Sequence, residues 1–163
     1  MSKQASVELL NKAVADELSA VHQYMYFHFH LDDCGLDPLA SLFKRTAITE
    51  MGHVEKLAER ILFLKGEVEM MASTPVAKIT DPVMMLAKAV EMERASALDY
   101  NKWAHACGES LDAATKQLFE SLVGDEEGHF DAFDKQQEHI REFGPAYLAL
   151  QSFGKEAEPA QAE

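Results

Sequence analysis

Apolar residues recur every three or four positions along four long stretches of the chain, which is the spacing of an amphipathic α-helix. No stretch shows the alternation of apolar and polar residues that marks a half-buried β-strand. The pattern predicts four long helices and a short fifth one, at about 4–34, 38–65, 82–107, 111–142 and 145–153. The last residues, 154–163, are polar and acidic and are expected to form a disordered tail, so that 1–153 is a single domain.

Residues with strong turn or capping preferences separate these stretches. Asp37 and Asp81 are each followed by a proline, so each is predicted to cap a helix whose first position is Pro38 or Pro82. Gly108 is expected to end the third helix.

The lengths of the connections predict the topology. The first and third connections are short, so each joins an antiparallel helical hairpin. The connection between 65 and 82 reaches about 45 Å when extended at ~3.3 Å per residue. The preceding helix is only ~42 Å long at 1.5 Å per residue. The loop can therefore cross the whole bundle, which predicts an all-α, ferritin-like four-helix bundle with one long crossover.

Composition excludes several function classes. Among 163 residues, 15 are Lys or Arg and 28 are Asp or Glu, giving a net charge of −13 that disfavours binding to nucleic acid. The two cysteines form no C-x-x-C motif, which excludes zinc-ribbon, rubredoxin and thioredoxin motifs. With neither a signal peptide nor an apolar stretch long enough to span a membrane, we expect a soluble cytoplasmic protein.

One pattern, Glu-x6-Tyr followed by Glu-x-x-His, occurs twice with identical spacing. In each copy the second glutamate follows the first by 33 positions. The first copy comprises Glu17, Tyr24, Glu50 and His53, and the second comprises Glu93, Tyr100, Glu126 and His129. Because each predicted hairpin carries one copy, a pseudo-twofold axis should relate them.

The residue types of this repeat favour a site for two metal ions. Glu and His at i and i+3 share one helical face, and here they interrupt apolar stripes, so they are expected to point into the bundle. Four buried carboxylates require compensation, which two divalent cations supply. Carboxylate and imidazole ligands suit iron or manganese. A tyrosine two turns along the helix is placed to hold a carboxylate in position. A single Glu-x-x-His is usually a solvated pair, and a bundle without metal would leave the four carboxylates unexplained.

At these residues the chain resembles the bacterioferritins, over about residues 4–153. The resemblance is strongest in TEMGHVEKLAERILFLKGE and GDEEGHFDAF, and weaker in ELSAVHQY. It implies a ferroxidase centre in which Glu50 and Glu126 bridge two irons, Glu17 and Glu93 are terminal ligands, and each histidine binds one iron. It also implies oxidation of Fe(II) by dioxygen or peroxide, and ferric mineral stored in a hollow shell of 24 identical subunits built from twofold dimers. A ferredoxin is a possible partner for iron release.

Met51 lies between two expected ligands, yet a helical step of about 100° turns it to another face of the helix. That face includes Ala47, Val54 and Ala58 and predicts a subunit contact. In bacterioferritins two such methionines ligate one b-type or related haem at the twofold interface. The resemblance thus makes Met51 a haem ligand, within a pocket of Leu18, Val21, His22, Met25 and Val54. The alternative is that Met51 only packs in the dimer contact.

The sequence differs from the bacterioferritin pattern at one site, and three related families remain as alternatives. Some bacterioferritins have an inner-surface iron site of Asp and His at the positions that Thr49 and Arg45 occupy here, so that site is not expected. The nearest rival is a ferritin-like ferroxidase without haem. A peroxide-reducing di-iron oxidase of the rubrerythrin type would usually add a C-x-x-C module. A DNA-protecting mini-ferritin would place its ligands between subunits and often carry a basic tail.

Overall fold

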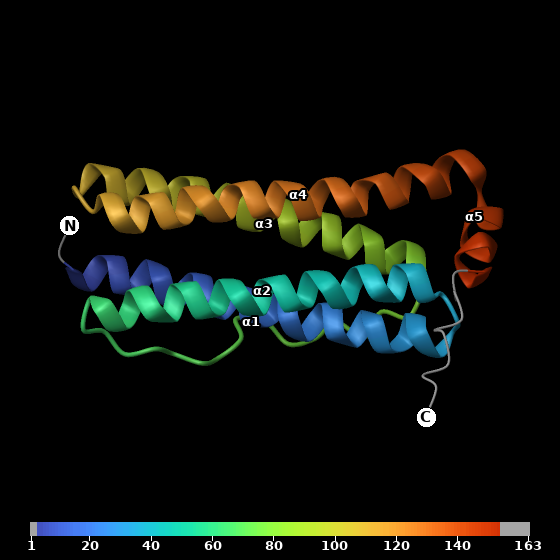
Figure 1. Cartoon of the computed structure of the whole chain (residues 1–163), viewed down its shortest axis with the longest axis horizontal. Coiled ribbons are helices and arrows are strands. Elements are labelled where there is room, and N and C mark those ends of the chain that lie inside the picture. Colours follow the sequence, from blue (N-terminus) through green and yellow to red (C-terminus); the bar gives the residue numbers. More distant parts are fainter. Residues whose placement is uncertain (1–2, 154–163) are drawn as a thin grey trace, which may run out of the picture.

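The computed structural model describes residues 3–153, and in this range it confirms the predicted order of helices (Figure 1). The helices are α1 (Lys3–Asp33), α2 (Asp37–Phe63), α3 (Pro82–Glu109), α4 (Ala113–Phe143) and α5 (Pro145–Leu150), followed by the 3₁₀ turn η1 (Gln151–Phe153). The fifth predicted helix is therefore split in two. The expected tail at 154–163 lies outside the described residues. No helix within 3–153 has the length and apolar character needed to span a bilayer.

The helix ends agree only in part with the expected caps. Asp81 caps α3 as predicted, because its side chain accepts a hydrogen bond from the Met84 N–H. The prediction for Asp37 was wrong, because α2 starts at Asp37 itself. Its negative charge there interacts favourably with the positive end of the helix dipole. Gly108 does not end α3 either, since the helix continues to Glu109 and the turn is made by Leu111, with a φ of 61°.

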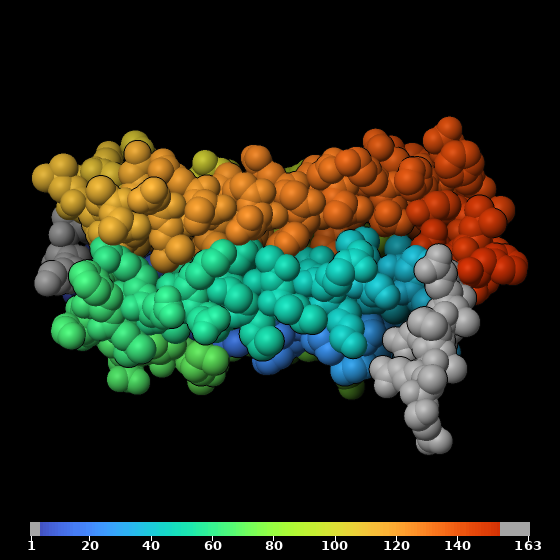
Figure 2. Space-filling view, viewed as in Figure 1, coloured from blue at the N-terminus to red at the C-terminus, as the bar shows by residue number. Residues whose placement is uncertain are grey.

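Two antiparallel hairpins, α1–α2 and α3–α4, pack side by side as predicted (Figure 1). In Figure 2, α2 and α4 lie next to each other across the face turned to the viewer, with α5 at one end. The turn between α1 and α2 depends on Gly35, whose φ of 70° suits glycine. The next residue donates its backbone N–H to the Leu31 carbonyl at 2.9 Å, which closes the end of α1.

The crossover between α2 and α3 is attached to α1 by three polar residues, Asn11, Ser19 and Gln23, which lie along one face of the helix. The Asn11 side chain bonds the backbone of Glu67 and Glu69, at 2.9 and 3.0 Å. The Ser19 hydroxyl accepts from the Thr74 N–H at 3.1 Å. The Gln23 amide donates to the Ala77 carbonyl at 3.0 Å and accepts from its N–H at 2.7 Å. These bonds satisfy backbone groups of a segment that has no secondary structure of its own.

Two apolar cores fill the bundle, one at each end, and leave its middle to polar residues. One core contains Leu10, Val14, Val54, Leu57, Ile61, Phe119 and Leu122. The other contains Ala20, Phe27, Phe43, Ala47, Met85 and Phe133. Along α1, Glu17 lies between Val14 of one core and Ala20 of the other. Both cores therefore seal the polar middle from solvent along the bundle axis.

An ion pair at one end of the bundle joins three helices. Asp112, the cap of α4, accepts hydrogen bonds from Arg60 Nη2 of α2 at 2.7 Å and from the Ser6 hydroxyl of α1 at 2.8 Å. Partial burial acts to raise the pKa of Asp112, but bonds from Thr115 and Ser6 and the charge of Arg60 outweigh it and lower that pKa.

Candidate metal centre

The six residues of the repeated motif converge in the middle of the bundle. Ligand atoms of Glu17, Glu50, His53 and Glu126 all lie within 4.8 Å of one another, and this group is called cluster 1. Ligand atoms of Glu50, Glu93, Glu126 and His129 meet the same limit and form cluster 2. The four carboxylates and His53 are at most 2% exposed. Each of the four long helices contributes, so the folded bundle itself builds the arrangement.

Glu50 and Glu126 belong to both clusters, whereas the other four residues belong to one each. His53 Nδ1 lies 2.9 Å from Glu50 Oε2, and His129 Nδ1 lies 2.9 Å from the other oxygen, Glu50 Oε1. The two imidazole rings are 6.0 Å apart, with an angle of 27° between their planes. Glu50 thus presents one oxygen to each histidine, which is the geometry of a carboxylate shared by two ions.

The two tyrosines hold carboxylates, but they do so across the hairpins. Tyr100 of α3 donates to Glu17 Oε1 of α1 at 2.5 Å, and Tyr24 of α1 donates to Glu93 Oε1 of α3. Both tyrosines are buried. The spacing along the helix predicts that each tyrosine can hold a carboxylate, but it does not say which one. The structure links each tyrosine to the first glutamate of the other motif copy, which ties the two hairpins together at the centre.

Several buried polar atoms of the centre have no hydrogen-bond partner among the described residues. They are both oxygens of Glu50, Glu93 Oε2, Glu126 Oε1 and His129 Nδ1. Although His129 Nδ1 and Glu50 Oε1 are 2.9 Å apart, the two atoms are not aligned for a hydrogen bond. Unpartnered buried polar atoms are costly, and cations placed between these atoms would satisfy them. The donor set of oxygens and imidazole nitrogens fits iron or manganese.

Electrostatics in the metal-free chain support the same conclusion. Burial raises the pKa of Glu126 to about 10 and that of Glu17 to about 7. Burial acts to lower the pKa of His53, but nearby carboxylates outweigh it and raise that pKa to about 12. The pKa of His129 is raised to about 10 for the same reason. Protons therefore provide positive charge where divalent cations would otherwise supply it, and metal binding must release protons.

Sequence reasoning missed one contact of the centre. Asp125 Oδ2 of α4 lies 3.2 Å from His53 Nε2 of α2, on the ring nitrogen that faces away from the cluster. It also lies 3.7 Å from Lys56 Nζ. The signal was present in the sequence, since Asp125 directly precedes Glu126 whereas Thr49 precedes Glu50. The two copies of the motif therefore differ at this position.

Met51 points away from the clusters, as the helical step predicts, and is 57% exposed beside the exposed Ile48. Of the expected pocket residues, Leu18, Val21 and Met25 are partly buried and His22 is exposed. Val54 is only 6% exposed, because the apolar core within the subunit already covers it. The exposed part of this face is therefore narrower than the sequence suggested. The thioether of Met51 is nevertheless exposed at the surface, and a thioether is a soft ligand of the kind that binds haem iron.

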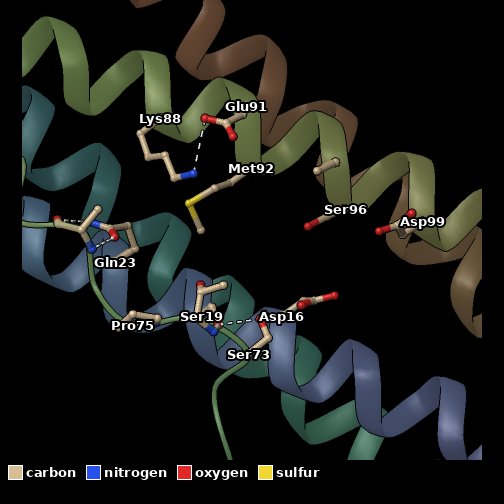
Figure 3. Close-up of a pocket in the computed structure, with 13 residues that line it drawn as sticks. Asp16, Ser19, Gln23, Ser73, Pro75, Lys88, Glu91, Met92, Ser96 and Asp99 are labelled. Atoms are coloured by element: carbon tan, nitrogen blue, oxygen red, sulfur yellow. Dashed lines mark hydrogen bonds and ion pairs between the residues drawn. The ribbon is translucent and has the colours of Figure 1, made fainter.

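A pocket of about 320 Å³ lies between α1, the crossover and α3, on the side of α1 that faces away from the metal centre (Figure 3). Asp16 and Asp99 line it, and each directly precedes a residue of the centre in sequence, Glu17 and Tyr100 respectively. Burial raises the pKa of Asp16, a bond to Ser73 lowers it, and the charge of Asp99 raises it further. The centre and this pocket occupy different faces of the same two helices.

Comparison with known proteins gives a consistent result. Residues 7–143 match the family described as ferritin-like domain. A bacterioferritin of Desulfovibrio desulfuricans is 36% identical over 147 residues, which is 90% of this chain and 82% of that protein. A bacterioferritin of Rhodobacter capsulatus is 36% identical over 145 residues, which is 88% of this chain and 89% of that protein. An X-ray structure of the Desulfovibrio desulfuricans bacterioferritin, described as showing its diiron site in different catalytic states, superposes with a TM-score of 0.92. It is 33% identical and covers 99% of this chain and 94% of its own.

Proposed function

This chain belongs to the ferritin-like family and, within it, to the bacterioferritins, and from that premise we propose which residues carry out its iron chemistry. The function is iron storage, with a di-iron centre that oxidises Fe(II). The proposed ferroxidase centre consists of Glu17, Glu50, His53, Glu93, Glu126 and His129.

One observation carries the proposal, namely that two ligand clusters share two carboxylates. An ion in cluster 1 would be held by Glu17 and His53, and an ion in cluster 2 by Glu93 and His129. Glu50 and Glu126 would bridge the two ions. The four carboxylates balance the charge of two divalent cations, so the site with two Fe(II) ions bound would carry no net charge.

The surrounding residues prepare the site for this role. Tyr100 and Tyr24 fix the terminal carboxylates Glu17 and Glu93, so the ligands are positioned before iron arrives. Burial of both bridging glutamates excludes bulk water, which strengthens their interaction with the cations. Oxidation removes one electron from each Fe(II), and we propose dioxygen or hydrogen peroxide as the acceptor of the electron pair.

Initial rates of Fe(II) oxidation test the site assignment. Glu17→Ala and Glu126→Ala should each abolish the fast phase of oxidation while the assembled protein still forms. Glu120→Ala is the matched control, because it removes an exposed carboxylate from the same helix as Glu126. Unchanged initial rates in the two centre variants would refute the assignment.

We further propose that Met51 from two copies of the chain ligates one b-type or related haem at a twofold interface. Exposure of Met51 on an apolar part of α2 supports this, because a twofold contact through that face brings the two thioethers together. Leu18, Val21, His22 and Met25 would border the haem, with Val54 behind them.

An absorption spectrum of the protein purified from its source distinguishes the two roles of Met51. Sharp haem bands that disappear in Met51→Leu, but persist in the control Met71→Leu on the exposed crossover, would support ligation. A haem-free spectrum would leave iron storage intact and limit Met51 to packing in the dimer contact.

As a bacterioferritin, the chain assembles with copies of itself, and we propose a hollow shell of 24 subunits. Large apolar side chains exposed on the single chain, such as Phe29, Phe63 and Leu98, support burial in an assembly. The elution volume in size-exclusion chromatography tests the number. Release of stored iron requires electrons, for which a ferredoxin is the proposed donor.

A further inference from the structure

The two halves of the centre are built from the same motif, but among the described residues only His53 has a carboxylate on the ring nitrogen that faces away from the clusters. Asp125 Oδ2 lies 3.2 Å from His53 Nε2 and crosses from α4 to α2 to reach it. In the other copy of the motif, the residue that corresponds to Asp125 is Thr49, since it directly precedes Glu50. The Thr49 hydroxyl is engaged with its own helix, where it donates to the Arg45 carbonyl at 3.2 Å. Among the described residues, the carboxylate contacts of His129 all involve Nδ1.

Burial and contacts follow the same asymmetry. The His53 side chain is 1% exposed, whereas that of His129 is 15% exposed. His53 Nδ1 has three carboxylates within 3.2 Å. His129 Nδ1 has Glu50 at 2.9 Å and Glu93 only at 3.5 Å, and it makes no hydrogen bond.

A carboxylate behind an imidazole has a defined chemical effect. When Nε2–H donates to Asp125, that nitrogen keeps its proton, and Nδ1 is the ring atom left to bind a cation in the cluster. The negative charge also makes Nδ1 a stronger donor to a cation, and the hydrogen bond restricts rotation of the ring. Lys56 Nζ lies 3.7 Å from the same carboxylate and places a positive charge beside it. Within residues 3–153, His129 has no such carboxylate on its Nε2.

We infer that Asp125 is a positioning residue that makes the two metal positions unequal, so that cluster 1 binds its ion first and more tightly than cluster 2. The ion beside His129 then binds second and is the first to leave. This inference rests on the proposed di-iron function and adds an order of binding to it.

Anaerobic titration of the assembled, metal-free protein with Co(II) tests the order of binding. Co(II) is stable against oxidation under these conditions, and its visible absorption reports each ion as it acquires imidazole and carboxylate ligands. Wild-type protein should bind two ions per chain in two unequal steps. His53→Ala should remove the tighter step and His129→Ala the weaker one, which assigns each step to a cluster.

Asp125→Asn supplies the decisive comparison. It should weaken the tighter step about 10- to 100-fold, the usual effect of removing a partner behind a metal ligand, and leave the weaker step unchanged. Glu120→Gln, which removes an exposed charge from the same helix, is the matched control and should alter neither step. A purely structural role for Asp125 would instead weaken both steps together.

The outcomes separate this inference from the proposed function. Two equal steps in the wild type, or an Asp125→Asn variant that titrates like the wild type, would overturn the inference and leave the di-iron centre standing. If the wild type does not bind Co(II), or if its binding is unchanged in His53→Ala and His129→Ala, both the inference and the proposed di-iron centre are overturned.

Discussion

The contacts of the two tyrosines across the hairpins give a prediction that the repeated motif alone would not. Tyr100→Phe removes the hydroxyl that donates to Glu17 at 2.5 Å, and Tyr24→Phe removes the one that donates to Glu93. We expect Tyr100→Phe to weaken metal binding at cluster 1 and Tyr24→Phe to weaken it at cluster 2.

The expected loss of metal affinity follows from the strength of the hydrogen bond that is removed. A hydrogen bond to a charged acceptor contributes about 1.5–3 kcal/mol. Glu17 also contacts His53 Nδ1, at 3.2 Å, in the metal-free chain. That nitrogen would be occupied by a bound cation, so Tyr100 becomes the remaining partner of Glu17 when metal is present. Its removal should therefore weaken binding about 10- to 100-fold, within the range expected for a residue behind a metal ligand.

Anaerobic Co(II) titrations in single-cluster backgrounds measure this effect. In His129→Ala only cluster 1 keeps its histidine, and in His53→Ala only cluster 2 does. Tyr100→Phe should weaken binding in the first background and spare the second, and Tyr24→Phe should do the reverse. The reasoning is refuted if each tyrosine affects the cluster of its own motif copy, or if neither affects binding.

Three further predictions concern the scaffold, each measured by urea denaturation. Gly66→Ala should destabilise the fold by about 1–3 kcal/mol, because the new Cβ would lie 2.6 Å from Val7 Cγ1. Gln23→Ala should cost about 1–3 kcal/mol and speed proteolysis of the crossover, since both bonds to Ala77 are lost. The pKa of Asp112 is lowered below its ordinary 3.8 in the folded chain. Its stabilisation is thus complete above about pH 4 and is lost as the pH falls through the lowered pKa, so Asp112→Asn should cost less at about pH 3 than at neutrality.

Much of this molecule is predictable because its signals are periodic. Apolar spacing gave the helices, connection lengths gave the crossover, and the duplicated Glu-x-x-His motif gave the six converging residues. Met51 was placed on the outer face by the helical step alone. Apart from the crossover, these inferences depend on which face of a helix a residue occupies, which the sequence determines directly.

Other features depend on contacts between helices, which spacing along one helix does not determine. The tyrosines bind the carboxylates of the opposite copy because the pseudo-twofold arrangement places α1 against α3 at the centre. Val54 belongs to the internal core and not to the outer stripe, which is decided by how the helices pack on one another. The end of α3 passes Gly108 because the positive φ falls on Leu111.

The central claim is that the shared carboxylates Glu50 and Glu126 hold two iron ions between the hairpins. Anomalous diffraction at the iron edge, from crystals loaded anaerobically with Fe(II), tests it most directly. The account predicts two peaks per chain in the middle of the bundle, one in cluster 1 and one in cluster 2, with both glutamates in contact with each ion. A single peak there, or iron found only outside the two clusters, would contradict it.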